Sequence, residues 1–171
     1  YVDVYQCDEN GKSSPWKRKA LEDVPKWQHE EAKDFNCFAT VQKYANDKKT
    51  DGEDFLAPLY FDLDYSEDPG VAQAEAVKLV EFFTGELDIQ EQDLHIYFSG
   101  SKGFHLLIDE RALGVEPRKD LQRVYKHIAG YLRYRLGDNQ DKESEEGRQV
   151  EYVEPLKAVD LVVYTVKRML R

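Results

Sequence analysis

The 171-residue chain has little of the material that builds disulfide-bonded, zinc-bound or membrane-spanning proteins. Its two cysteines, Cys7 and Cys37, are too few for a disulfide framework or a zinc site with four cysteine ligands. No apolar run approaches the roughly 20 residues that a membrane-spanning helix needs. These absences predict a reduced, cytoplasmic protein that has no membrane segment.

Positive charge is also scarce, since 24 Lys and Arg residues stand against 34 Asp and Glu residues and the formal net charge is −10. This balance argues against a protein that binds nucleic acid with its whole surface, but it leaves room for a local basic groove. The length and the hydrophobic fraction of 41% fit one packed core. We therefore expect residues 1–171 to form a single domain. We also expect this domain to be a fragment of a longer chain.

Residue patterns predict both strands and helices. Runs of β-branched and aromatic residues favour strands at residues 1–5, 36–44, 56–64, 94–98 and 104–108. Apolar residues three or four apart predict helices at residues 71–87 and 117–136. Three further segments are a charged loop at 137–147, an apolar β-branched stretch at 158–164 and the start of a helix at 166–171. This mixture predicts an α+β domain.

The most informative stretch is Phe61-Asp62-Leu63-Asp64, at the end of a predicted strand. Residues two apart on a strand point to the same face, so Asp62 and Asp64 project together. Neighbouring carboxylates repel each other unless a cation lies between them, and Mg²⁺ prefers such ligands. A pair of acidic residues that faces water at a strand end is the alternative interpretation.

A second motif, Ser99-Gly100-Ser101-Lys102-Gly103-Phe104-His105, joins two predicted strands. Its glycines let backbone N–H groups converge on an anion, and its Ser, Lys and His side chains add further donors. The motif therefore favours a phosphate site, although an ordinary hairpin loop has the same composition. It lacks the ending of a Walker A loop, so a P-loop ATPase is not indicated.

A third feature is Asp160, which lies within an apolar run and is followed by Lys167, Arg168 and Arg171. A buried aspartate without a partner is unfavourable, and a metal ion shared with Asp62 and Asp64 would remove that cost. A strand-end aspartate followed by a solvated basic helix face remains the alternative.

In this order the three motifs resemble the archaeo-eukaryotic primase superfamily, over about residues 38–171. This superfamily includes primase small subunits, primase-polymerases of plasmids and mobile elements, and the polymerase domain of bacterial end-joining ligases. The stretch at residues 99–105 is especially similar to the last group and to replication-element primases. The chain departs from the pattern because it has no Cys/His zinc cluster and does not continue after Arg171 into the further basic segment that members usually carry.

The resemblance implies an RRM-like catalytic core, in which helices flank a mixed sheet. It also implies a DNA primase or primase-polymerase, which is a nucleotidyltransferase that primes or extends on a single-stranded DNA template. In such an enzyme Asp62, Asp64 and Asp160 hold two Mg²⁺ or Mn²⁺ ions, and His105 stabilises phosphate charge as a further catalytic residue. The contacts that it implies to the incoming dNTP or NTP are Ser99, Ser101, Lys102, His105, Arg168 and Arg171. A helicase or another replication domain in the full-length chain, and a mobile-element origin, are further expectations.

Two other functions remain as alternatives. A metal-dependent nuclease would need the carboxylates but no triphosphate site, and a non-catalytic single-stranded nucleic-acid-binding module would need neither. If a template is bound, basic residues are the expected contacts, although those on the second helix also suit a solvated face. The expected template groove comprises Lys17, Arg18, Lys19, Arg123, Lys126, Arg133 and Arg135.

Overall fold

The computed structural model of the chain describes residues 1–33, 36–100, 102–143, 149–164 and 169–170. Its strands are β1 (Val2–Cys7), β2 (Lys17–Lys19), β3 (Asn36–Thr40), β4 (Leu59–Asp64), β5 (Leu94–Phe98), β6 (Gly103–Ile108), β7 (Asp138–Glu143), β8 (Gln149–Glu154) and β9 (Met169–Leu170). Its helices are α1 (Val24–Lys26), α2 (Pro69–Gly85) and α3 (Leu121–Arg135), and its short helical turns are η1 (Leu21–Asp23), η2 (Trp27–Glu31) and η3 (Glu91–Asp93).

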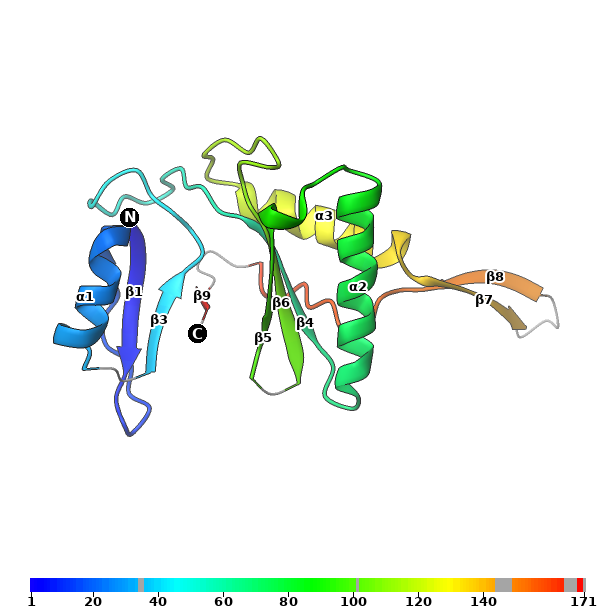
Figure 1. Ribbon diagram of the computed structural model, residues 1–171, viewed down its shortest axis with the longest axis horizontal. Coiled ribbons are helices and arrows are strands. Elements are labelled where there is room, and N and C mark those ends of the chain that lie inside the picture. The colour runs from blue at the N-terminus through cyan, green and yellow to red at the C-terminus, as the bar shows by residue number, and fades with distance from the viewer. Residues whose placement is uncertain (34–35, 101, 144–148, 165–168, 171) are drawn as a thin grey trace.

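The strands form three sheets, with the orders β2-β1-β3-β9, β4-β6-β5 and β7-β8. Strands and helices are both present, so the predicted α+β class is confirmed. Every pairing between the described strands is antiparallel, whereas a mixed sheet was expected. Figure 1 shows the β7-β8 pair projecting away from the other two sheets.

The central sheet has the connectivity of an RRM-like core. From β4 the chain runs through α2, β5, β6 and α3, and it then returns along β4, where Val159 bridges Leu63. The order in space is therefore residues 158–160, β4, β6 and β5. This is a β-α-β-β-α-β unit. Its two middle strands form a hairpin, and its two helices pack on the sheet.

One face of the central sheet carries the main core. The rings of Phe61 on β4 and Phe83 on α2 lie 5.9 Å apart, and the hydroxyl of Tyr125 on α3 donates to the carbonyl oxygen of Ala57 just before β4. Both helices thus pack on the face of Leu59, Phe61 and Leu63. The N-terminal sheet lies on the other side of the central sheet from α2 (Figure 1).

The N-terminal sheet has a smaller core of its own. Four buried residues form it, and they are Val2, Val4, Trp27 and Ala32. The guanidinium of Arg18 on β2 is buried beside this core and bonds to Asp3 on β1 and to Glu53 in the long loop before β4. A buried arginine with two carboxylate partners ties the sheet to that loop.

Two predicted segments differ in the structure. Residues 137–147 were expected to be a charged loop, but Asp138–Glu143 forms β7 and pairs with β8. Residues 166–171 were expected to begin a helix, but Met169–Leu170 pairs with β3, and the rest of that segment lies outside the described residues. The polar composition of β7 hides its pairing with β8, because Asp138–Glu143 contains no apolar residue. None of the described helices is long and apolar enough to cross a membrane.

Candidate active site

The two aspartates of the first motif lie at the end of β4. Phe61 and Leu63 point into the core and are almost fully buried, so Asp62 and Asp64 must point to the opposite face. Their side chains are 16% and 38% exposed. The strand therefore delivers two partly exposed carboxylates to one face of the central sheet, as the alternation predicts.

Asp160 comes to the same place from the far end of the chain. The backbone N–H of Asp160 donates to the carbonyl oxygen of Asp62 (2.9 Å), and the N–H of Asp64 donates to that of Ala158 (2.9 Å). Directly paired residues on antiparallel strands project to the same face, so this register sets Asp160 beside Asp62. One oxygen of the Asp160 carboxylate accepts the N–H of Val162 at 2.8 Å. The backbone pairing thus places the three predicted aspartates on two adjacent, paired segments and on one face of the sheet.

A buried glutamate holds this returning segment in place. The carboxylate of Glu75 on α2 accepts the backbone N–H groups of Lys157 at 2.6 Å and Ala158 at 2.8 Å. Glu75 was not among the residues predicted from the sequence, although a signal for it exists. Glu75 lies between Ala72 and Leu79 on the apolar stripe of α2, where an acidic residue needs a buried partner.

The β5-β6 hairpin supplies the other polar groups. His105 on β6 lies directly opposite Asp62, and its Nε2 atom is 3.4 Å from Oδ1 of Asp62. Lys102, in the hairpin loop, places its Nζ atom 3.4 Å from Oδ2 of Asp64. Both residues therefore reach the carboxylates from the neighbouring strand. The predicted residues Ser101, Arg168 and Arg171 lie outside the described residues.

The hairpin loop is closed by its own residues. The N–H of Ser99 donates to the carbonyl oxygen of Gly103 at 2.9 Å, and the N–H of Gly103 donates to the hydroxyl oxygen of Ser99 at 3.2 Å. Gly100 has a φ of 90°, which favours glycine. In the structure Ser99 thus stabilises the hairpin, and its hydroxyl hydrogen remains available to a ligand.

The chemistry of these donors fits a hard divalent cation. Aspartate oxygens are the ligands that Mg²⁺ and Mn²⁺ prefer, and Asp62, Asp64 and Asp160 lie on neighbouring positions of one face. Among the residues that the structure describes, however, no three acidic, His or Cys side chains are close enough to share one metal ion.

Most of the basic residues expected to form the template groove bind other side chains or backbone groups of the chain. Arg18 is the clearest correction, because its side chain is only 3% exposed and its guanidinium stacks on the ring of Tyr44. Burial alone would lower the pKa of Arg18, but its bonds to Glu53 and Asp3 outweigh burial and raise it. Arg18 is thus a structural residue. Lys17 and Lys19 both pair with Glu31.

The basic residues of α3 are similarly divided. Arg123 pairs with Asp120, Arg135 pairs with Glu86, and Arg133 donates to the carbonyl oxygen of Leu156. Lys126 is exposed. Among the described residues, the basic side chains of β2 and of α3 are thus bound to partners on different elements.

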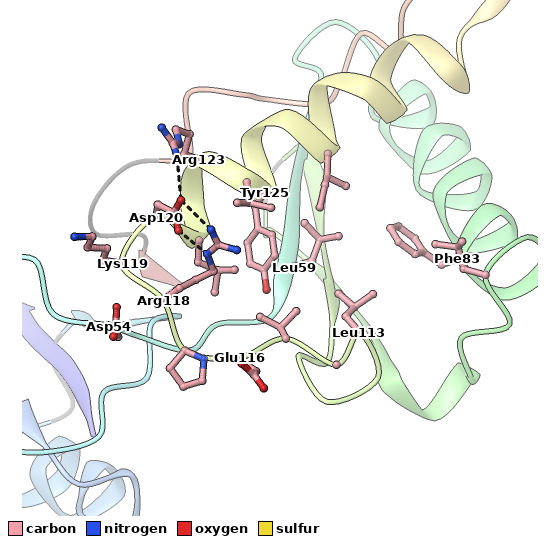
Figure 2. Close-up of a pocket in the computed structure, with 17 residues that line it drawn as sticks. Asp54, Leu59, Phe83, Leu113, Glu116, Arg118, Lys119, Asp120, Arg123 and Tyr125 are labelled. Carbon is pink, nitrogen blue, oxygen red and sulfur yellow. Dashed lines mark hydrogen bonds and ion pairs between the residues drawn. The ribbon is translucent and has the colours of Figure 1, made fainter.

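A large pocket lies away from this site. It encloses about 1160 Å³ between α3, the end of α2 and the loop before α3 (Figure 2). Leu59, Phe83 and Tyr125 line it, so it lies on the helix-covered side of the sheet. At its rim the hydrogen bond from Arg118 lowers the pKa of Asp120 to about 2, which keeps this ion pair charged.

A smaller pocket of about 450 Å³ lies closer to the aspartates. Leu107 and His95 line it together with residues of the N-terminal sheet, among them Val2 and Ala39. Leu107 follows His105 by two residues on β6, so the pocket adjoins the face that carries Asp62.

Comparisons with known proteins agree with the motifs. A family model of the DNA primase small subunit matches residues 61–170, which is more than half of the chain and includes the three aspartates and the β5-β6 hairpin. The chain is also similar to the DNA primase small subunit of Thermoplasma volcanium, with 34% identity over 38% of this chain and 24% of that protein. The match thus spans about a quarter of that relative's length. This chain belongs to the DNA primase small subunit family.

Proposed function

We propose that the chain carries the catalytic site of a primase-type nucleotidyltransferase, which joins nucleoside triphosphates along a single-stranded DNA template. One observation supports this proposal most. Asp62 and Asp64 on β4, Asp160 on the returning segment, and Lys102 and His105 from the hairpin all lie at one end of one sheet face. Family membership supports the same reaction class.

Asp62, Asp64 and Asp160 are the residues that would hold Mg²⁺ or Mn²⁺. Bound there, two such ions would activate the attacking 3′-oxygen and neutralise the charge of the leaving pyrophosphate. The protein fixes the backbone positions of the three aspartates, because residues 158–160 pair with β4 and Glu75 anchors that segment. Rigid positioning is most of what phosphoryl-type transfer needs from a protein.

Lys102 and His105 are the proposed phosphate contacts. Each lies 3.4 Å from a carboxylate of the site. Each can therefore reach a phosphate that binds to a metal ion at the same carboxylates. His105 donates a hydrogen bond from its ring to a phosphate oxygen, which stabilises developing charge. Ser99 offers its hydroxyl from the hairpin, and Ser101, Arg168 and Arg171 are further proposed contacts.

The test is template-directed synthesis. The chain is incubated with single-stranded DNA, Mn²⁺ or Mg²⁺ and labelled NTPs or dNTPs, and the products are separated by length. We expect metal-dependent products whose composition follows the template. Asp62→Asn and Asp64→Asn should each abolish synthesis, because each removes a charged ligand.

The control is Asp54→Asn, which removes an acidic residue from the rim of the distant pocket in Figure 2 and should leave synthesis unchanged. Loss of the template strand without growth would identify a nuclease instead. DNA binding that survives both aspartate substitutions, with no synthesis by the unsubstituted chain, would identify a non-catalytic binding module.

A further inference from the structure

An exposed tyrosine lies on the same sheet face as the candidate site. In the register of β5 and β6, Tyr97 is directly opposite His105, and His105 is directly opposite Asp62. The three side chains therefore form one row across the sheet. Tyr97 is 53% exposed at the end of this row, on the edge strand β5.

The neighbouring residues of β5 separate the two faces of the strand. Ile96 and Phe98 are also exposed, but they alternate to the opposite face, where the ring of Phe98 packs edge-on against Phe104. Among the described residues Tyr97 has neither a ring contact nor a hydrogen bond from its hydroxyl. An exposed aromatic ring without such contacts can stack on a flat aromatic ligand.

The surroundings of Tyr97 suit an aromatic base better than a phosphate. The charged groups of this face, Asp64 and Lys102, lie at the loop end of the hairpin. In the other direction the next row contains Leu107 and His95, which line the mostly apolar pocket of about 450 Å³. Along the strands the face thus changes from charged groups to a pocket lined mostly by apolar side chains, and Tyr97 lies between the two. The lining of that pocket also includes the ion pair of Lys43 and Glu110.

A nucleotide has the same division, with charged phosphates at one end and a flat apolar base at the other. We propose that Tyr97 stacks on a nucleobase of the nucleic acid or nucleotide whose phosphates are bound near Asp62 and Lys102. This inference rests on the proposed function. The stacked base belongs either to the incoming nucleotide or to the single strand, and the ring chemistry is the same for both.

The experiment compares Tyr97→Ala, Tyr97→Phe and Ile96→Ala in the full chain. Ile96 is the matched control, because it is 51% exposed on the same strand and faces the other way. The probes are ATP, inorganic tripolyphosphate, a labelled oligothymidylate and the same oligonucleotide with abasic sites. Dissociation constants and melting temperatures are measured for every variant.

Tyr97→Ala should weaken binding of ATP or the oligonucleotide by about five- to 150-fold, the range expected for loss of one base-stacking contact. Tyr97→Phe keeps the ring and should bind as the unsubstituted chain does, and so should Ile96→Ala. Binding of tripolyphosphate and of the abasic strand should not change, because neither offers a base to Tyr97. The ligand that is weakened identifies the source of the stacked base.

Three results would overturn the inference. Unchanged affinity of Tyr97→Ala for ATP and for the oligonucleotide, while the unsubstituted chain binds them, would remove Tyr97 and leave the proposed function intact. An equal loss of tripolyphosphate binding, or a large fall in melting temperature, would show that Tyr97 supports the fold. Failure of the unsubstituted chain to bind either ligand would remove both proposals.

Discussion

Gly103 lies at a position of the candidate site that has no room for a side chain. A Cβ atom at this position would overlap the carbonyl oxygen of Leu63 and lie 2.8 Å from Oδ1 of Asp64. Glycine is needed here for the close approach of β6 to β4, and not for an unusual backbone angle. The motif predicts that both glycines serve anion binding, but in the structure Gly103 lets the two strands approach each other beside Asp64.

Gly103→Ala should therefore destabilise the chain by about 1–3 kcal/mol, the range typical of overpacking. It should also displace Asp64 and lower metal-dependent synthesis. Chemical denaturation measures the first effect, and the primer assay measures the second. Gly85→Ala is the control, because no atom lies within 4 Å of a Cβ there and its φ is ordinary, so stability should stay the same or rise slightly. Equal stability of both variants would contradict this account.

Tyr97 and Arg18 show how little a residue's type says about its role. Arg18 belongs to a basic run that predicts nucleic-acid binding, yet Asp3 and Glu53 bury and neutralise it. Tyr97 is an aromatic residue in an apolar strand, where a buried side chain is expected, yet it is half exposed beside His105. Both outcomes depend on which residues lie opposite in space.

At the scale of elements, the candidate site depends on the segment after β8, because this segment carries Asp160. Residues 158–160 make two backbone hydrogen bonds to β4, and this pairing carries Asp160 to Asp62. Side-chain hydrogen bonds also hold the segment. Glu75 accepts from Lys157 and Ala158, the Tyr60 hydroxyl donates to the carbonyl oxygen of Val163, and the Tyr164 hydroxyl donates to that of Tyr60.

Glu75→Gln tests this anchor. An amide keeps the shape of the side chain but has one accepting oxygen, so one of the two N–H groups loses its partner. We expect a loss of about 1–3 kcal/mol in the free energy of unfolding, the cost of an unsatisfied buried group. We also expect weaker binding of Mn²⁺ because Asp160 is less firmly held. Denaturant titration and Mn²⁺ titration measure the two effects.

The control for this anchor is Glu81→Gln, since Glu81 is an exposed glutamate on the same helix, α2. It should change neither quantity. Unchanged Mn²⁺ affinity in Glu75→Gln, together with lowered stability, would mean that Glu75 supports the fold but does not position Asp160.

At the scale of the whole molecule, the two cores differ in size and in what stabilises them. The core around β4, β6, α2 and α3 has many buried apolar residues, whereas the N-terminal core has four. The N-terminal sheet relies more on the ion pairs of Arg18.

Hydrogen bonds from Arg18 lower the pKa of Glu53 below its ordinary value of 4.5. This contribution is present above pH 4.5 and is lost as pH falls through the lowered pKa.

We therefore expect the N-terminal sheet to unfold first on acidification. Trp16 and Trp27 both lie in this part, so tryptophan fluorescence reports on it alone, while far-UV circular dichroism reports mainly on α2 and α3. The fluorescence transition should begin at a higher pH than the loss of helical signal. Glu53→Gln should lower stability at pH 7 and flatten its dependence on pH below 4.5. Coincident transitions in the unsubstituted chain would show that the two cores unfold as one unit.

Local sequence alone determined much of this protein. The alternation around Asp62 predicts its face, the apolar periodicity predicts α2 and α3 within a few residues, and the paired runs at 94–98 and 104–108 predict the hairpin. These features depend on contacts between residues that are near in the chain. The order of the three motifs was also enough to identify the superfamily to which the matched primase family belongs.

Only the tertiary structure decided which distant residues meet. The approach of Asp160 to Asp62, the burial of Glu75 and Arg18, and the pairing of β7 with β8 all join segments that local patterns treat separately. A charged side chain looks the same in the sequence whether it faces water or a buried partner. Its role is set by the free energy of that partner contact, which exists only after the chain has folded.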